Sequence, residues 1–315
     1  MARICIVGGS GFIGRHVAER LVRDQHTVII PTRNRERAKR DLITLPTVDL
    51  LLADIHDDRQ LDRLFTGCDA VINLVGVLHS KPGRPYGPLF ARAHVELPRR
   101  ITEACARRRV TRMVQMSALG AAHDAPSEYL RSKAAGERVA LESPLDVTVF
   151  RPSTVFGPED RFLNLFATLQ RYLPVLFLPM ADARMQPVYV GDVAHALVAC
   201  LGEDKSFGQI YELGGPRVYS LRQLVEYAGE LSGHRRPVIG LGRTLSLAQG
   251  FAMEWLPVKL LSRDNLRSMQ VASVTDAALP FGIQPTPLEA VAPEYLGENR
   301  MVSRYERFRH FAARR

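Results

Sequence analysis

Tyr129 and Lys133 are the first residues whose types and spacing suggest chemistry. They stand four positions apart in the segment YLRSK, and on a helix this spacing places both side chains on one face. A free tyrosine titrates at ~10, and an ammonium fixed beside it favours the phenolate and lowers that pKa. Such a pair can exchange a proton with a carbonyl or an alcohol during hydride transfer. Ser117, upstream of both, is the third candidate catalytic residue.

A glycine-rich turn is predicted to hold the cofactor that this chemistry requires. The segment GGSGFIG, residues 8–14, matches both the G-x-x-G-x-x-G and the G-x-G-x-x-G spacing. It lies between an apolar run, ICIV, and an amphipathic stretch, which is the context in which the pattern binds a dinucleotide. The glycines permit a tight turn and close approach of a pyrophosphate, and the helix N-terminus attracts the phosphates. A turn without a ligand is the alternative interpretation. The predicted contacts are Gly8, Ser10, Gly11, Phe12, Ile13 and Gly14.

The residue after the second predicted strand distinguishes the two nicotinamide dinucleotides. An acid there would accept hydrogen bonds from a ribose 2′-hydroxyl, but the sequence VIIPTRNRERAKR has Thr32 and then Arg33. An arginine can hold a 2′-phosphate through two parallel hydrogen bonds. The pattern therefore favours NADP(H) over NAD(H), with Arg33 as the phosphate ligand. We interpret the cations between Arg35 and Arg40 as mostly a solvated helix face.

Two further strand ends are predicted to face the same cofactor. Asp54 closes the third predicted strand in LLLAD, where a carboxylate beside the ligand crevice can accept a bond from the adenine amino group. The fourth strand runs into NLVG, in which Val75 and Gly76 let the backbone approach the cofactor closely.

Short apolar runs alternate with amphipathic stretches through the first half of the chain. This alternation is typical of a parallel sheet covered by helices on both faces. Right-handed crossovers then favour a doubly wound α/β fold of the Rossmann type. The predicted strands are Arg3–Val7, Thr27–Ile30, Val48–Leu52, Ala70–Leu74, Arg112–Met116 and Asp146–Phe150. The predicted helices are Ile13–Arg23, Arg35–Leu42, Arg59–Phe65, Phe90–Arg108 and Ser127–Leu141.

Prolines crowd the chain after Phe150, and the pattern changes to scattered helices and short strands. We therefore expect residues 1–156 to form an NAD(P)-binding domain, residues 157–299 a smaller substrate lobe, and residues 300–315 a basic tail. The candidate strands that return to the main sheet lie at Gln186–Val190 and Gln209–Leu213.

Composition and charge exclude several classes of protein. With 46% hydrophobic and 24% charged residues among 315, the chain is globular rather than disordered or collagen-like. Four widely separated cysteines and an N-terminus without signal-peptide features predict a cytoplasmic protein. No apolar run is long enough to span a bilayer, and no His or Cys spacing indicates a metal site. The net charge is +9, but the sequence contains no nucleic-acid recognition motif, so nucleic acid is not an expected partner.

The tail carries much of the basic charge. Residues 300–315 contain six Arg and one Glu, interleaved with three aromatic residues. Such a tail is suited to contact with an anionic membrane surface, on its inner face, or with an acidic partner. A solvated terminal helix is the alternative interpretation.

Taken together, these motifs resemble the short-chain dehydrogenase/reductase superfamily, in the extended and atypical branch that includes NAD-dependent epimerases and dehydratases. GGSGFIG, LLAD, YLRSK, RPSTVFGPED and PVYVGDVAHAL carry the resemblance over nearly the whole chain. YLRSKAAGE and FRPSTVFGPEDRFLN are more narrowly similar to the NAD(P)-binding accessory subunits of respiratory complex I, the alpha subcomplex subunit nine family. The resemblance implies tightly bound NADPH. It also implies that Pro152 and Val155 lie beside the nicotinamide and that Lys133 binds the nicotinamide ribose.

Two departures from the family pattern keep two functions open. Extended members usually carry a catalytic Ser or Thr two positions after the serine that Ser117 matches, where this chain has Leu119, and often an Asn where it has His94. One function is an NADP(H)-dependent oxidoreductase acting on a small or isoprenoid-like, lipid-like carbonyl or alcohol. The other is a non-catalytic, cofactor-holding accessory or assembly factor of a membrane respiratory complex. The candidate apolar substrate contacts, equally interpretable as core, are Phe177, Leu178, Phe251, Met253, Trp255 and Leu256.

Overall fold

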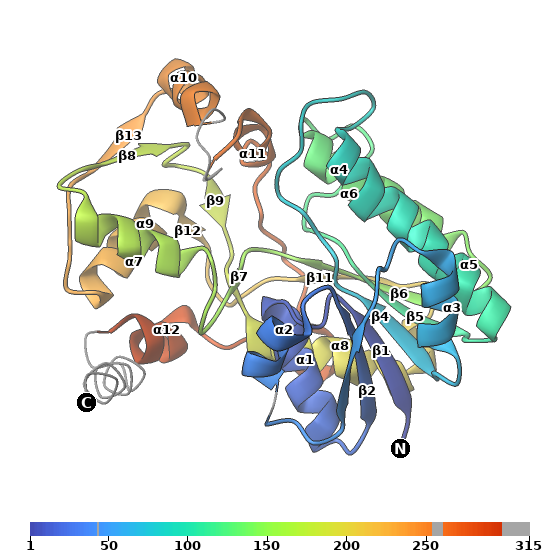
Figure 1. Ribbon diagram of the computed structural model, residues 1–315. Coiled ribbons are helices and arrows are strands. Elements are labelled where there is room, and N and C mark those ends of the chain that lie inside the picture. Colours follow the sequence, from blue (N-terminus) through green and yellow to red (C-terminus); the bar gives the residue numbers. More distant parts are fainter. Residues whose placement is uncertain (43, 254–260, 298–315) are drawn as a thin grey trace.

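Seven parallel strands form the central sheet of the computed structural model, which describes residues 1–42, 44–253 and 261–297 (Figure 1). Their order is β3-β2-β1-β4-β5-β6-β11, and every neighbouring pair is parallel. The strands are β1 (Arg3–Val7), β2 (Thr27–Thr32), β3 (Val48–Leu52), β4 (Ala70–Asn73), β5 (Arg112–Met116), β6 (Asp146–Pro152) and β11 (Ile210–Leu213). The predicted doubly wound sheet is thus confirmed. The winding reverses between β1 and β4, where such sheets bind ligands beyond the carboxyl ends of their strands.

Each face of the sheet carries its own apolar cluster, because successive residues of a strand point to opposite faces. Ile4 and Ile6 of β1 belong to the cluster that α1 and α8 cover. Cys5 and Val7 belong to the cluster beneath α3, α5 and the end of α6. The helices are α1 (Phe12–Arg23), α3 (Asp58–Phe65), α5 (Leu97–Arg108), α6 (Glu128–Leu141) and α8 (Val190–Ala199), with α2 (Arg35–Leu42) beside β3.

The helix predicted at Phe90–Arg108 is divided into three pieces. These are a short helix, α4 (Pro88–Phe90), a π-helical segment, η1 (Ala91–Glu96), and α5. Pro98 has no N–H to donate to the carbonyl of His94, and that carbonyl lies directly against Gly136 of α6, where no Cβ would fit. The irregular segment brings α6 close, so it helps to position the helix that carries Tyr129 and Lys133.

The two segments expected to return to the main sheet behave differently. Gln209–Leu213 contributes β11, which pairs with β6 at the sheet edge. The other segment, Gln186–Val190, contains β10 (Val188–Tyr189), which pairs with β7 (Val155–Phe156) in a separate two-stranded sheet. A short apolar strand has the same sequence pattern whether it joins the main sheet or pairs elsewhere. Periodicity alone therefore could not identify the partner of either segment.

The smaller C-terminal lobe has an apolar core of its own, built from Phe156, Leu163, Leu178, Leu224 and their neighbours. Asp160 anchors this lobe: its carboxylate accepts bonds from the Leu163 amide at 2.7 Å and the Tyr295 hydroxyl at 2.8 Å. The elements of the lobe are α7 (Leu163–Tyr172), β8 (Leu176–Pro179), β9 (Arg184–Met185), β12 (Tyr219–Ser220), α9 (Leu221–Leu231), β13 (Val238–Leu241), α10 (Arg243–Met253), α11 (Arg263–Ser268) and α12 (Leu288–Leu296). No helix among the described residues combines the length and the apolar character needed to cross a bilayer.

Candidate cofactor and active site

The glycine-rich turn joins β1 to α1 with a geometry that leaves space for a ligand. Gly8 has a φ of +91°, and the Gly11 amide donates to the Gly8 carbonyl at 3.0 Å. A Cβ on Gly14 would fall 2.5 Å from the Cα of Gly9, so this glycine is required by packing. A Cβ on Gly11 would meet only the Gly8 carbonyl oxygen, at 3.2 Å. The space beside Gly11 therefore fits a phosphate approaching the backbone.

The start of α1 also has the electrostatics of an anion site. Gly11 is its N-cap residue, no side chain caps the helix, and the first turn contains no acid. The amides of a helix N-terminus that lack intrahelical partners attract negative charge. Ser10, Phe12 and Ile13 lie half-buried around this turn.

The ends of β2, β3 and β4 place three predicted contacts along the same edge. Arg33 follows β2 and is exposed. Thr32 before it is buried, and its hydroxyl donates to the Asn34 carbonyl and accepts from the Asn34 amide. Asp54 follows β3, and its carboxylate accepts from the His56 amide at 2.9 Å. Val75 follows β4 and lies close to Gly8: a Cβ added to Gly8 would be 3.2 Å from the backbone nitrogen of Val75.

Lys133 connects the ends of β4 and β5. Its buried ammonium donates to the Met116 carbonyl at 3.3 Å, and it lies 3.2 Å from the position of a Cβ on Gly76. Burial lowers the pKa of Lys133 from 10.5 to about 8, against the opposing charge of Glu137. The same Glu137 accepts two bonds from Arg151 of β6, at 2.9 and 2.6 Å, which fixes α6 on the sheet.

Ser117 follows β5 directly and is almost fully buried. Within the described part of the chain its hydroxyl has no hydrogen-bond partner, although its own amide donates to the Phe150 carbonyl at 2.7 Å. A buried, unpaired hydroxyl in a native fold needs an explanation, and a bound ligand is one. Pro152, at the end of β6, accepts from the Leu119 amide at 3.0 Å, and Val155 starts β7 beyond it. Leu119 itself is buried.

Tyr129 differs electrostatically from the sequence-based expectation. Burial raises its pKa to about 12, and the charge of Lys133 makes no contribution that lowers it. The ring packs edge-on against His94 at 5.5 Å and against Phe90 at 6.0 Å between centroids. The expected depression of the pKa is therefore wrong for the protein without ligands, because burial outweighs the shared helix face. The phenol is protonated at neutral pH.

His94 holds two segments of the site together, a role that the sequence does not reveal. In the sequence His94 stands out only because extended family members often have Asn at this position. Its Nε2 accepts from the Val77 amide at 3.1 Å, and its Nδ1 lies 2.8 Å from the Ser132 hydroxyl. The tautomer that satisfies both contacts carries the proton on Nδ1. Burial, and secondarily Lys133, lowers the pKa of His94 to about 2, so it is neutral. The ring thereby links the loop after β4 to the helix that carries Tyr129.

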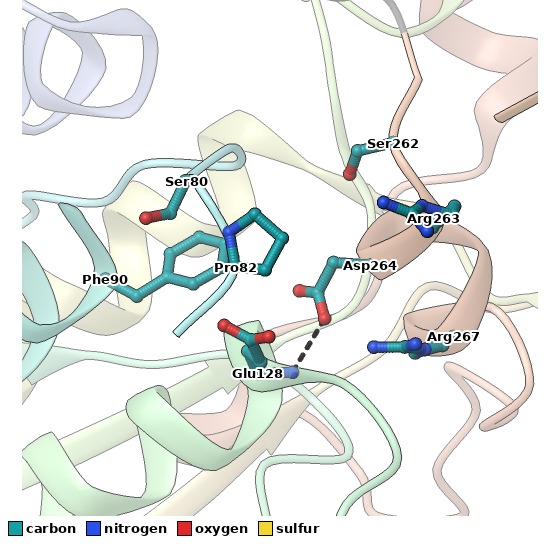
Figure 2. A pocket seen from close by; sticks show the side chains of 8 residues that line it. All are labelled: Ser80, Pro82, Phe90, Glu128, Ser262, Arg263, Asp264 and Arg267. Atoms are coloured by element: carbon teal, nitrogen blue, oxygen red, sulfur yellow. Dashed lines mark hydrogen bonds between the residues drawn. The ribbon is translucent and has the colours of Figure 1, made fainter. Parts of the chain in front are cut away.

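Asp264 is a second residue that sequence reasoning missed. From α11 it accepts bonds from the amides of Glu128 and Tyr129, at 2.7 and 3.0 Å, and so caps α6 across the two lobes. Glu128 in turn accepts from Gly87 at 2.7 Å in the loop after β4. A cavity of about 130 Å³ lies at this junction, and Figure 2 shows the side chains that line it. Its lining residues are Ser80, Pro82, Phe90, Glu128, Ser262, Arg263, Asp264 and Arg267.

Several remaining expectations fall outside this arrangement. Phe177 and Phe251 are exposed, and Leu178 belongs to the core of the C-terminal lobe. The described residues do not include Trp255, Leu256 or the tail at 300–315. The side chain of Met253 is not described either. Among the described residues, no group of three or more acidic, His or Cys side chains could hold a metal ion.

The pKa of Lys133 predicts a pH dependence for cofactor binding. The ammonium is present below pH 8 and is lost as the pH rises through about 8 in the free protein, whereas ribose oxygens bound at Lys133, as the resemblance implies, would favour the charged form. We expect the dissociation constant for NADPH to rise about tenfold or more above that pH, since a hydrogen bond from a charged group is worth roughly 1.5–3 kcal/mol. Fluorescence titration from pH 7 upward measures this. Lys133→Met should bind weakly with a flat profile, and equal slopes in both proteins would contradict the prediction.

Comparison with known proteins relates this geometry to a family. Residues 4–214 match the NAD dependent epimerase/dehydratase family. NADH dehydrogenase (ubiquinone) 1 alpha subcomplex subunit 9 of Arabidopsis thaliana is 33% identical over 228 residues, which span 70% of this chain and only 56% of that protein. The Mus musculus protein of the same name is 30% identical over 315 residues, spanning 94% of this chain and 80% of that protein.

Other similar proteins are named as enzymes. The ceramide reductase of Caulobacter vibrioides is 30% identical over 199 residues, spanning 62% of this chain and 60% of that protein. A dTDP-glucose 4,6-dehydratase from Streptomyces venezuelae, solved with NAD bound, superposes with a TM-score of 0.65 at 21% identity, over 76% of this chain and 85% of that one. This likeness shows the fold. The chain therefore belongs to the NAD-dependent epimerase/dehydratase family, a family of nicotinamide dinucleotide-binding Rossmann proteins, and within it to the relatives of alpha subcomplex subunit 9 of NADH dehydrogenase.

Proposed function

We propose that the protein is an NADP(H)-dependent oxidoreductase that reduces a carbonyl group, or oxidises the corresponding alcohol, in a small or lipid-like substrate. The observation that carries this proposal is the buried Ser117 hydroxyl, which has no hydrogen-bond partner among the residues that the structure describes. It adjoins Met116, whose carbonyl accepts from Lys133. A buried, unpaired hydroxyl at the end of a central strand suits a site that receives a polar oxygen of a substrate.

The protonation states of the site residues favour the reductive direction. Bound NADPH supplies a hydride. Tyr129 is protonated at neutral pH, so its hydroxyl can donate the proton that a reduced carbonyl oxygen requires. Ser117 orients the oxygen by a hydrogen bond, and Lys133 holds the ribose of the cofactor. The name of the Caulobacter relative, a ceramide reductase, supports a lipid-like substrate.

Turnover of NADPH tests this proposal. Purified protein is mixed with NADPH and a panel of quinones, ketones and long-chain carbonyl lipids, and oxidation of the cofactor is followed by absorbance. Consumption of NADPH with a matching reduced product supports the enzyme. No consumption with any member of the panel, from protein shown to bind NADPH, would favour the second candidate below.

The second candidate is a cofactor-holding accessory or assembly factor of a respiratory complex at the inner face of a membrane. The specific observation in its favour is the similarity to subunit 9 of NADH dehydrogenase, which spans 94% of this chain. Leu119 and His94, in place of the residues usual in extended members, fit this role as well. Cofactor binding is common to both candidates, so only turnover separates them.

Arg33 should make NADPH bind more tightly than NADH. It is exposed at the end of β2, at the edge where β1 and β2 meet the phosphate-binding turn. One charged, two-pronged contact with a 2′-phosphate is worth ~1–3 kcal/mol, or roughly 5- to 150-fold in affinity. Titration of Arg33→Ala should show that the ratio of NADPH affinity to NADH affinity falls towards one while NADH affinity is unchanged. Arg37→Ala, also exposed, serves as the matched control, and equal affinities in the unsubstituted protein would refute the assignment.

A further inference from the structure

The start of α6 is capped from both lobes. Its own N-cap residue, Ser127, accepts a bond from the Leu130 amide at 3.2 Å. The first amides of a helix lack acceptors within it, and those of Glu128 and Tyr129 come first in α6. Asp264 of α11 supplies both acceptors: Oδ1 takes the Glu128 amide at 2.7 Å, and Oδ2 takes the Tyr129 amide at 3.0 Å. Figure 2 shows this carboxylate directed from α11 towards Glu128.

Two bonds to two oxygens fix the direction of the helix end as well as its position. A carboxylate at a helix N-terminus is also favoured by the helix dipole. One of the two amides belongs to Tyr129 itself, so a single hydrogen bond joins Asp264 to the backbone of the candidate general acid. α11 can hold this contact because it is fixed in turn: Leu266 is 1% exposed, and the Asn265 side chain donates to the Leu78 carbonyl in the loop after β4 at 3.1 Å.

The two turns of α6 that carry site residues are anchored differently. The turn of Lys133 is held by the first domain, since the ammonium donates to a carbonyl at the end of β5 and the Ser132 hydroxyl lies 2.8 Å from Nδ1 of His94. The turn of Tyr129 has its backbone amide bonded from the C-terminal lobe, by Asp264. Loss of Asp264 should therefore disturb Tyr129 and leave Lys133 in place.

The cavity at the lobe junction places this contact beside space for a ligand. Asp264, Glu128 and Phe90 all line it. The Phe90 ring also packs against the Tyr129 ring, with 6.0 Å between centroids. The carboxylate that holds α6 therefore lies at the candidate site and not at a remote helix end.

We propose that Asp264 is a positioning residue: through the two amides it sets where the Tyr129 hydroxyl stands against the substrate. This inference rests on the proposed function, in which that hydroxyl donates the proton. Ring contacts with Phe90 and His94 remain when Asp264 is replaced, so the expected effect is a shift of the hydroxyl and not its removal from the site. A misplacement of about 1 Å can lower a rate ~10²-fold.

Steady-state oxidation of NADPH by the full chain, with a substrate that it turns over, tests this role. Asp264→Ala is expected to lower kcat roughly 10- to 100-fold. The dissociation constant for NADPH, from fluorescence titration, should stay unchanged because the anchors of Lys133 remain. Asp264→Asn keeps one acceptor oxygen and should lose less, so it replaces Asp264→Ala if that variant unfolds at the assay temperature.

A matched control removes a different acid of the C-terminal lobe. Glu289 of α12 also accepts two bonds from the lobe, in its case from Arg217 and Tyr219. Glu289→Gln should therefore leave kcat unchanged. An equal fall of kcat in Glu289→Gln and Asp264→Ala would overturn the proposal, because any weakening of the lobe would then suffice.

A double-substitution cycle separates the positioning of Tyr129 from a general structural role. If Asp264 acts through Tyr129, Asp264→Ala should lower kcat in the unsubstituted protein and have no further effect in Tyr129→Phe. Equal losses in both backgrounds would overturn the proposal. Amide hydrogen exchange at the start of α6 gives a readout without turnover. Faster exchange in Asp264→Ala with an unchanged kcat would reduce the carboxylate to a helix cap and also overturn the proposal.

The activity of the unsubstituted protein distinguishes this inference from the proposed function. If no member of the substrate panel is turned over, the proposed function fails and the positioning role fails with it. If the unsubstituted protein and Asp264→Ala turn over equally, only the positioning role fails.

Discussion

Gly11→Val is expected to abolish binding of NADPH and NADH while leaving the apoprotein folded. Gly11 has φ −84° and ψ 178°, an extended conformation that a β-branched residue adopts readily. Its Cβ would touch only the Gly8 carbonyl oxygen, at 3.2 Å, so the fold can accommodate the substitution. The two methyl groups then occupy the space that a pyrophosphate requires. Loss of one or two charge-assisted hydrogen bonds, each worth roughly 1.5–3 kcal/mol, predicts at least ~10²-fold weaker binding.

Gly14→Ala provides the contrasting control within the same turn. Its Cβ would lie 2.5 Å from the Cα of Gly9 and 2.6 Å from the Gly9 carbonyl oxygen. Overpacking of this kind costs ~1–3 kcal/mol, so this variant should lose both thermal stability and cofactor. Calorimetry of unfolding and of NADPH binding on both variants distinguishes the two roles. Unaltered affinity in Gly11→Val would show that the turn does not bind phosphate.

Tyr129→Phe is expected to remove most turnover and leave cofactor affinity nearly unchanged. The ring keeps its packing against Phe90 and His94, and only the hydroxyl is lost. Removal of a general acid typically lowers a rate ~10²–10⁴-fold. The measurements are steady-state NADPH oxidation with an active substrate and direct titration of NADPH.

Lys133→Met should harm both quantities, because by the proposed assignment the ammonium holds the nicotinamide ribose, and turnover requires a bound and oriented cofactor. A silent Tyr129→Phe together with a harmful Gly11→Val, measured in cells by recovery of the respiratory complex, would exclude the enzyme and retain the cofactor. Equal loss of NADPH affinity in Tyr129→Phe and Lys133→Met would contradict the separation of roles.

Much of the fold follows from local pattern. Three strands have the bounds that the sequence predicts: Arg3–Val7, Val48–Leu52 and Arg112–Met116. An apolar run between two turn signals leaves few other positions at which a strand could begin or end. The glycine motif was readable for a similar reason, since its function depends on residues close together in sequence.

What the sequence could not reveal depends on contacts between distant segments. The bonds that Asp264 accepts from the amides at the start of α6 join residues 136 and 135 positions apart, and nothing in the segment SRDN specifies this partner. The raised pKa of Tyr129 arises from burial, which helical spacing does not report. The exposure of Phe251 could not be inferred from the sequence either, because an apolar residue is usually core.

The position of β11 and α8 has a consequence for anyone who wishes to exchange the substrate lobe with that of a relative. Residues 190–213 supply the outer strand of the main sheet and a helix that covers α1, although they follow the first lobe segment in sequence. A chimaera spliced once, after β6, would therefore import a foreign edge strand and a foreign layer of the nucleotide-binding core. A graft that respects the architecture needs an additional pair of junctions, one before α8 and one after β11, so that the host chain keeps both elements.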